Sequence, residues 1–144
     1  MRWRVTEPNL TNGSADMGIS SDLQRAIVAR LRAAVPSVAG RVYDNPGEKA
    51  PHPHITIGPS YWSPDDAECI KARSETLQID IWASNKPDKQ AAKDAADEAA
   101  AALDGWASDV LAMHPLRVSL VRIMDDPAPG VVHGVVQVEA SIEG

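Results

Sequence analysis

The chain has 144 residues, of which 44% are hydrophobic, and it carries a formal net charge of −6. This length suits one domain with its own hydrophobic core, and the single cysteine, Cys69, excludes an intramolecular disulfide. The negative charge argues against general binding to duplex DNA. With no apolar run of about 18 residues and no signal-peptide pattern, the sequence predicts a soluble chain that folds in the cytoplasm and contacts no membrane.

The first 19 residues are polar and show no sustained periodicity. We expect a flexible N-terminal arm over residues 1–19 and a single domain over residues 20–144. Met17 lies directly before the first helical pattern, so one hypothesis takes it as the natural first residue. An ordinary flexible terminus, and an arm that orders against a neighbouring subunit, are the two alternatives.

The first helix is predicted to begin at Ser20 or Ser21. Residues 21–24 form a capping-box pattern, in which a serine hydroxyl and a glutamine side chain satisfy backbone amides at the helix start. Pro36 is expected to end the helix. Apolar residues recur on one stripe between these points, at Leu23, Ile27, Leu31 and Ala34 or Val35.

Residues 40–84 favour β-strands. Short strands are predicted at 42–43 and 54–58, on either side of a turn-like stretch at 44–50. Between the second of these strands and the next, a loop is predicted over residues 60–74. Long loops in compact domains are often functional.

The clearest alternation in the chain covers residues 76–82. Leu77, Ile79 and Ile81 are expected to face inward, whereas Gln78, Asp80 and Trp82 face the other way. A tryptophan on the polar face indicates that something covers it. We interpret the cover as the second helix, with a neighbouring subunit as the alternative.

The second helix is predicted to follow Pro87, which is tolerated at a helix start because its missing N–H costs little there. Gly105 is its expected stop. Its stripe of small residues would let it lie close to a sheet, and comprises Ala92, Ala96, Ala99 and Leu103.

A terminal hairpin is predicted from strands at 117–125 and 131–140. On the second of these, Val132, Val136 and Val138 share the inner face and His133 lies on the polar face, where a solvated or cross-strand role is expected. The predicted fold is therefore α+β: a mainly antiparallel sheet of four to five strands packed with two helices, in the order α-β-β-(β)-α-β-β.

No residue pattern points to catalysis. His52 and His54 are separated by one proline and lack a ligand cluster at metal-binding spacing, and Cys69 is interpreted as inert. Asp125 and Asp126 are adjacent, and adjacent strand residues face opposite ways, so they are expected to cap a turn. Phosphate-binding and nucleophile motifs are absent. We therefore predict no enzyme activity, no catalytic residue, no cofactor and no metal.

Five segments, taken in order and spacing, carry a resemblance over residues 20–143. They are the helix start Leu-Gln-Arg-Ala-Ile at 23–27, the strand Pro-His-Ile-Thr-Ile-Gly at 53–58, the strand Thr-Leu-Gln-Ile-Asp-Ile-Trp at 76–82, the alanine-rich helix at 91–103, and Asp-Asp-Pro at 125–127 leading to His-Gly-Val-Val at 133–136. Together they resemble the tail-completion, or tail-terminator, family of long-tailed bacteriophages, prophages and gene transfer agents.

The resemblance implies a structural virion protein that forms a homo-oligomeric ring, a hexamer, at the head-proximal end of a siphophage-type tail. This ring would terminate the tail tube and join it to the head. The implied partners are further copies of the chain, the major tail tube protein and head-completion or connector proteins, with assembly in the host cytoplasm. Genomic DNA would pass through the lumen without specific binding, and an acidic lumen would repel it.

Open sheet edges and long loops suit the closure of such a ring. The positions that we select for subunit or partner contacts lie on turns, on the predicted loop and at one exposed aromatic: Glu48, Lys49, Tyr61, Trp62, Asp65, Asp66, Trp82, Asp125 and Asp126. The alternative is a protein of another class, a small monomeric or dimeric αβ nucleic-acid-binding or regulatory module, for which an outward Trp82 offers weak support. A small hydrolase or metalloenzyme is the residual third reading.

Overall fold

The computed structural model describes residues 18–45 and 50–144. Two α-helices and a five-stranded sheet form an α+β fold, as predicted. The elements are α1 (Ile19–Ala34), the 3-10 helix η2 (Pro36–Val38), β1 (Val42–Tyr43), β2 (His54–Pro64), β3 (Ala72–Ser84), α2 (Gln90–Leu103), β4 (Arg117–Asp125) and β5 (Val131–Glu143). Residues 1–17 of the predicted N-terminal arm and the residues Glu48 and Lys49 lie outside the described part of the chain, whereas Ile19, which we had placed in the arm, begins α1.

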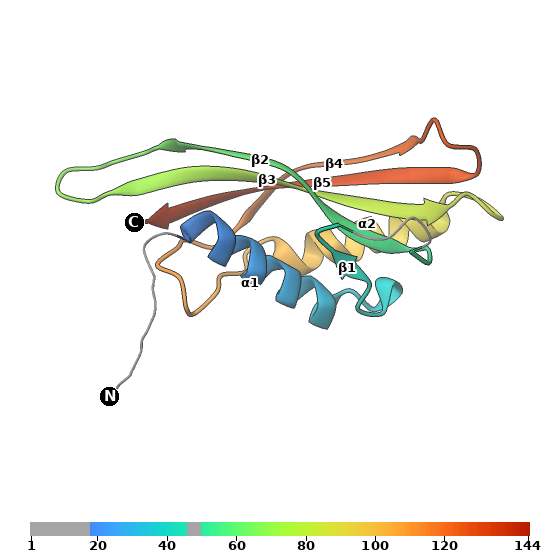
Figure 1. Ribbon diagram of the computed structural model, residues 1–144, viewed down its shortest axis with the longest axis horizontal. Helices are drawn as coiled ribbons and strands as arrows, with labels where there is room; N and C mark the ends of the chain where they lie inside the picture. Colours follow the sequence, from blue (N-terminus) through green and yellow to red (C-terminus); the bar gives the residue numbers. More distant parts are fainter. Residues whose placement is uncertain (1–17, 46–49) are drawn as a thin grey trace.

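The strands are ordered β1-β2-β3-β5-β4 across the sheet. Only β1 and β2 pair in parallel, and the other neighbours are antiparallel. Both helices pack on the same face of the sheet, so the opposite face carries no helix (Figure 1). We call these the helix face and the open face. None of the helices within residues 18–45 and 50–144 is long and apolar enough to cross a membrane.

The hydrophobic core lies between the helix face and the two helices. Its larger side chains come from the predicted stripe of α1 and from the inward residues of β3 and β5, and each such side chain stabilises the fold by about 1.5–3 kcal/mol when fully buried. From α2, by contrast, the core receives mainly methyl groups. The buried residues of that helix are Ala92, Ala95, Ala96, Ala99, Ala102 and Leu103.

The predicted capping box at the start of α1 is wrong. The helix begins at Ile19 with Gly18 as its N-cap residue, and no side chain caps it. Because the helix begins before Ser21, that serine is already inside the first turn. The neighbouring Ser20 instead donates its hydroxyl to Oε1 of the buried Glu75 on β3, at 2.9 Å.

The predicted loop over residues 60–74 is also wrong, because β2 and β3 continue through most of it. Their pairing reaches Pro64 and Arg73, and residues 65–71 alone connect them. A bulge between Ile57 and Ser60 shifts the register, so the side chains change faces there and the simple alternation is lost. The result is a long β2–β3 hairpin, residues 60–77, which we call the hairpin extension. Its β3 arm also pairs with β5 as far as Ala72, and its far end projects past the helices (Figure 1).

Candidate functional site

Four rings form a row across the open face of the sheet. His54 on β2 pairs with Trp82 on β3, and Trp82 pairs with His133 on β5. The Trp82 and His133 rings are stacked, with centroids 4.1 Å apart and planes 10° apart. Tyr43 on β1 extends the row, with its centroid 5.9 Å from that of His54.

The predicted cover of Trp82 by the second helix is wrong. The alternation of β3 places Trp82 on the open face, whereas α2 packs with Ile79 and Ile81 on the helix face. The tryptophan is instead half-buried by His133, and its Nε1 donates to Oγ1 of Thr56 at 2.9 Å. His133 thus takes the cross-strand role that its polar face predicted.

Asp80 anchors this row from β3, two residues before Trp82 and on the same face of the strand. It is buried, its Oδ1 lies 2.7 Å from Nε2 of His133, and the same oxygen accepts a hydrogen bond from Gln78 at 2.8 Å. A Cβ at Gly58 would come within 2.4 Å of Asp80 Oδ2. The absence of a side chain at Gly58 therefore leaves the space that the carboxylate occupies.

The pKa of His54 lies below its ordinary value of 6.5, chiefly because burial removes water from the ring. The hydrogen bond with the Pro51 carbonyl raises the pKa, and the positive charges of His52 and Arg41 lower it. The folded protein therefore takes up this proton at a lower pH than the unfolded chain. The stability that His54 contributes is complete above about pH 6.5 and falls as the pH drops through the folded pKa.

We therefore expect the melting temperature to fall between pH 7.5 and pH 5.5, and to fall less in His54→Gln, which cannot take up the proton. Thermal unfolding followed by circular dichroism at both pH values measures this difference. An equal fall in melting temperature in the two proteins would mean that titratable groups other than His54 cause it.

The hairpin extension carries two exposed aromatic residues, so neither belongs to the core. The exposed fractions of Tyr61 and Trp62 are 68% and 48%. The guanidinium of Arg73 lies over the Trp62 ring, 3.8 Å from its centroid, and Arg73 also donates to the Ser20 hydroxyl at 3.3 Å. These contacts join the far part of the extension, just behind residues 65–71, to the start of α1.

The predicted acidic candidates lie at opposite ends of the sheet. Asp65 and Asp66 are exposed where β2 meets the connection 65–71. Asp125 ends β4 and pairs with Lys89 at 3.3 Å, while Asp126 accepts a hydrogen bond from the Ala128 amide at 2.9 Å. Asp126 thus has the turn-capping role that we expected. The selected residues therefore do not form one cluster. Their role in contacts between subunits stays a prediction.

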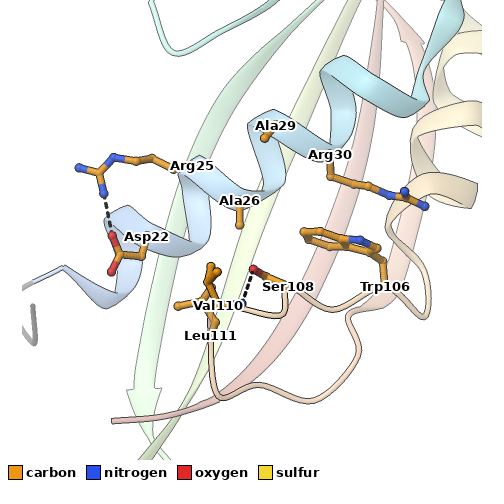
Figure 2. A pocket seen from close by; sticks show the side chains of 9 residues that line it. All are labelled: Asp22, Arg25, Ala26, Ala29, Arg30, Trp106, Ser108, Val110 and Leu111. Carbon is orange, nitrogen blue, oxygen red and sulfur yellow. Dashed lines mark hydrogen bonds and ion pairs between the residues drawn. The ribbon is translucent and has the colours of Figure 1, made fainter.

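A groove that the sequence did not predict lies on the helix side of the molecule. It occupies about 720 Å³ between α1 and residues 106–111. Figure 2 shows its apolar lining of Ala26, Ala29, Trp106, Val110 and Leu111, with Asp22, Arg25, Arg30 and Ser108 around it. The only signal for it in the sequence is Trp106, a large aromatic residue directly after the second helix.

The described residues hold no cluster of candidate metal ligands. Within residues 18–45 and 50–144, no group of three or more histidine, cysteine or acidic side chains is placed to bind a metal. Cys69 is exposed. This part of the chain also offers three surfaces: an open sheet face, a projecting hairpin and a groove.

Comparisons with known proteins agree with this reading. The model of a family described as "Tail completion protein gp17" matches residues 25–143. A chain from the virion of a native gene transfer agent particle has a similar fold, with a TM-score of 0.74 and 21% identity, over 88% of this chain and 98% of that one. The gp17 protein of bacteriophage SPP1 has a TM-score of 0.58 and 22% identity, over 85% and 90% of the two chains. No curated protein matches the sequence.

Proposed function

Because this chain belongs to the tail completion protein gp17 family, and is therefore a structural protein of a phage-type tail, we propose that it forms a hexameric ring that terminates the tail tube. The proposed place of the ring is the head-proximal end of the tail. Its proposed neighbours are the major tail tube protein on one side and head-completion or connector proteins on the other. The match over residues 25–143 is the observation that carries this proposal.

The two edges of the sheet support self-association. At one edge, β1 pairs only with Ile55 and Thr56, so the remainder of β2 has no strand among the described residues on the side away from β3. At the other edge lies β4, where Leu120 and Val121 are 41% and 40% exposed. Open edges with exposed apolar side chains are templates for pairing with another chain, and two different edges favour a head-to-tail contact that closes into a ring.

The charge of the subunit suits the passage of DNA. Each copy carries a net charge of −6, so six copies carry about −36, and a surface of this sign repels the phosphate backbone. We infer that genomic DNA passes through the lumen without specific binding. A lumen lined mainly by arginine and lysine would contradict this inference.

The mass of the protein in solution tests the ring. Six copies of a 15.4 kDa chain give about 92 kDa, and light scattering after size exclusion is expected to show this mass or a rise toward it with concentration. A chain that stays monomeric at every concentration, and also when purified tail tubes are added, would contradict the proposal. Tight, salt-sensitive binding to an oligonucleotide would favour the nucleic-acid-binding module instead.

A further inference from the structure

The groove between α1 and residues 106–111 has the character of a docking site. Its lining is mainly apolar, and Val110 on its wall is 82% exposed. One end of this wall is held in place, because the Leu116 amide donates to the Trp106 carbonyl at 2.7 Å and the Arg30 guanidinium lies over the Trp106 ring, 5.6 Å from its centroid. A large exposed side chain held beside an apolar hollow indicates that another surface covers both.

The rim of this groove carries two arginines against one carboxylate, Asp22, and this balance favours a negatively charged occupant. Arg25 contacts Asp22 at 2.7 Å through one nitrogen, and its side chain is 71% exposed. A guanidinium has five N–H donors, so most of those on Arg25 point toward solvent or a partner. Arg30 adds a second positive charge along the same side of α1.

The far end of the hairpin extension has the complementary character. Residues 65–71, which we call the tip, are all exposed and include three carboxylates against one lysine. The tip also carries an apolar side chain, Ile70, which is 47% exposed. A backbone bridge between Ala67 and Ile70 and the hydrogen bond from the Ala72 amide to Asp66 hold its shape.

The tip is tied away from the groove of its own chain. The Gly144 amide donates to the Lys71 carbonyl at 2.8 Å, and Arg73 donates to Ser20, so the extension is fastened to the body just behind the tip. Figure 1 shows the tip beyond the end of the helices. An occupant with the chemistry of this tip must therefore come from another copy.

We propose that the tip of one subunit docks into the groove of the next, with Ile70 against Val110 and with the tip carboxylates, Glu68 among them, facing Arg25. This inference rests on the proposed ring and specifies one of its contacts. A head-to-tail contact of this kind uses two different surfaces of the same chain, so each copy offers a tip to one neighbour and a groove to the other.

The native Cys69 lies in the tip beside Ile70 and makes a direct test available. Wild-type protein is mixed with the double variant Cys69→Ser, Val110→Cys and oxidised gently. The only disulfide that can then join the two proteins links Cys69 of one to the cysteine introduced at position 110 of the other. Mass spectrometry of the digested mixture is expected to find this linked peptide, and Val110→Cys alone is expected to give a ladder of products up to the closed ring.

A matched control places the cysteine at Ala91, which is also exposed but lies at the start of α2 and not on an edge strand of the sheet. In the Cys69→Ser background this variant is expected to give at most a tenth of the link formed at position 110. Arg25→Glu combined with Val110→Cys is expected to reduce the link about tenfold, and Glu68→Arg on the wild-type partner to restore it.

The outcomes separate this inference from the proposed ring. A hexamer by mass that yields no disulfide between Cys69 and position 110 would overturn the docking contact and leave the ring in place. The same disulfide in a closed dimer would support the docking contact and overturn the ring. Equal links at positions 110 and 91 would mean random collision and would overturn the docking contact.

Discussion

Replacement of Ile79 by alanine is expected to lower the free energy of unfolding by about 2–5 kcal/mol. Ile79 is fully buried at the centre of β3, which has β2 on one side and β5 on the other. The helix above this region, α2, presents alanine side chains, which are too short to extend into the space left behind. The cavity therefore persists, and its free-energy cost adds to the free energy lost with the buried side-chain atoms. Urea unfolding followed by circular dichroism measures the change.

Ile79→Val is the matched control for this cavity. It removes one methyl group from the same place, and its expected cost is about 0.5–1.5 kcal/mol. Equal losses in the two variants would mean that the core collapses around the alanine. In that case α2 would not be held at a fixed distance from the sheet.

Replacement of Asp80 by alanine is expected to cost about 1.5–3 kcal/mol, the range for hydrogen bonds to a charged group. The substitution removes the contact with His133 Nε2 and leaves Gln78 without its acceptor. We also expect the stacked Trp82 and His133 rings to lose their fixed geometry. Urea unfolding gives the first result, and the near-ultraviolet circular dichroism of the tryptophan gives the second.

Asp80→Asn separates the charge of this residue from its shape. The amide oxygen still accepts from Gln78, and the side chain still fills the space beside Gly58, so we expect a smaller loss than in the alanine variant. An asparagine variant as unstable as the alanine variant would assign the whole effect to the charge. An alanine variant as stable as the wild type would contradict the anchoring role that we assign to Asp80.

The fold class and most helices and strands could be predicted from the sequence, because the spacing of apolar residues in these elements matches the side that is buried in the fold. The stripe Leu23, Ile27, Leu31 is buried as its spacing requires, and so are the inward residues of β3. Prediction failed where a single feature changed the phase of the pattern. The bulge after Ile57 concealed the second half of β2, and the early start of α1 moved Ser21 away from the cap position.

The candidate surfaces were harder to predict than the fold. Trp82 was correctly placed on the polar face, but its cover comes from His133, which lies 51 positions later in the chain and becomes its neighbour only through the register of β3 and β5. The groove beside α1 depends on the path of residues 106–111, which follow no periodic pattern. Tyr61 and Trp62 were singled out as aromatic residues, and their exposure follows from the projection of the hairpin extension.

The pairing of β3 with β5 has a mechanical consequence. Thirteen consecutive residue pairs join these strands, from Ala72 with Glu143 at the tip end to Ser84 with Val131 at the opposite end. At about 3.4 Å per residue this ladder is roughly 40 Å long. A pull applied along the strands loads all its hydrogen bonds in shear at once, so they resist together and do not open one after another. Tension that reaches the tip is thus carried toward the far turn mainly by the backbone hydrogen bonds between β3 and β5.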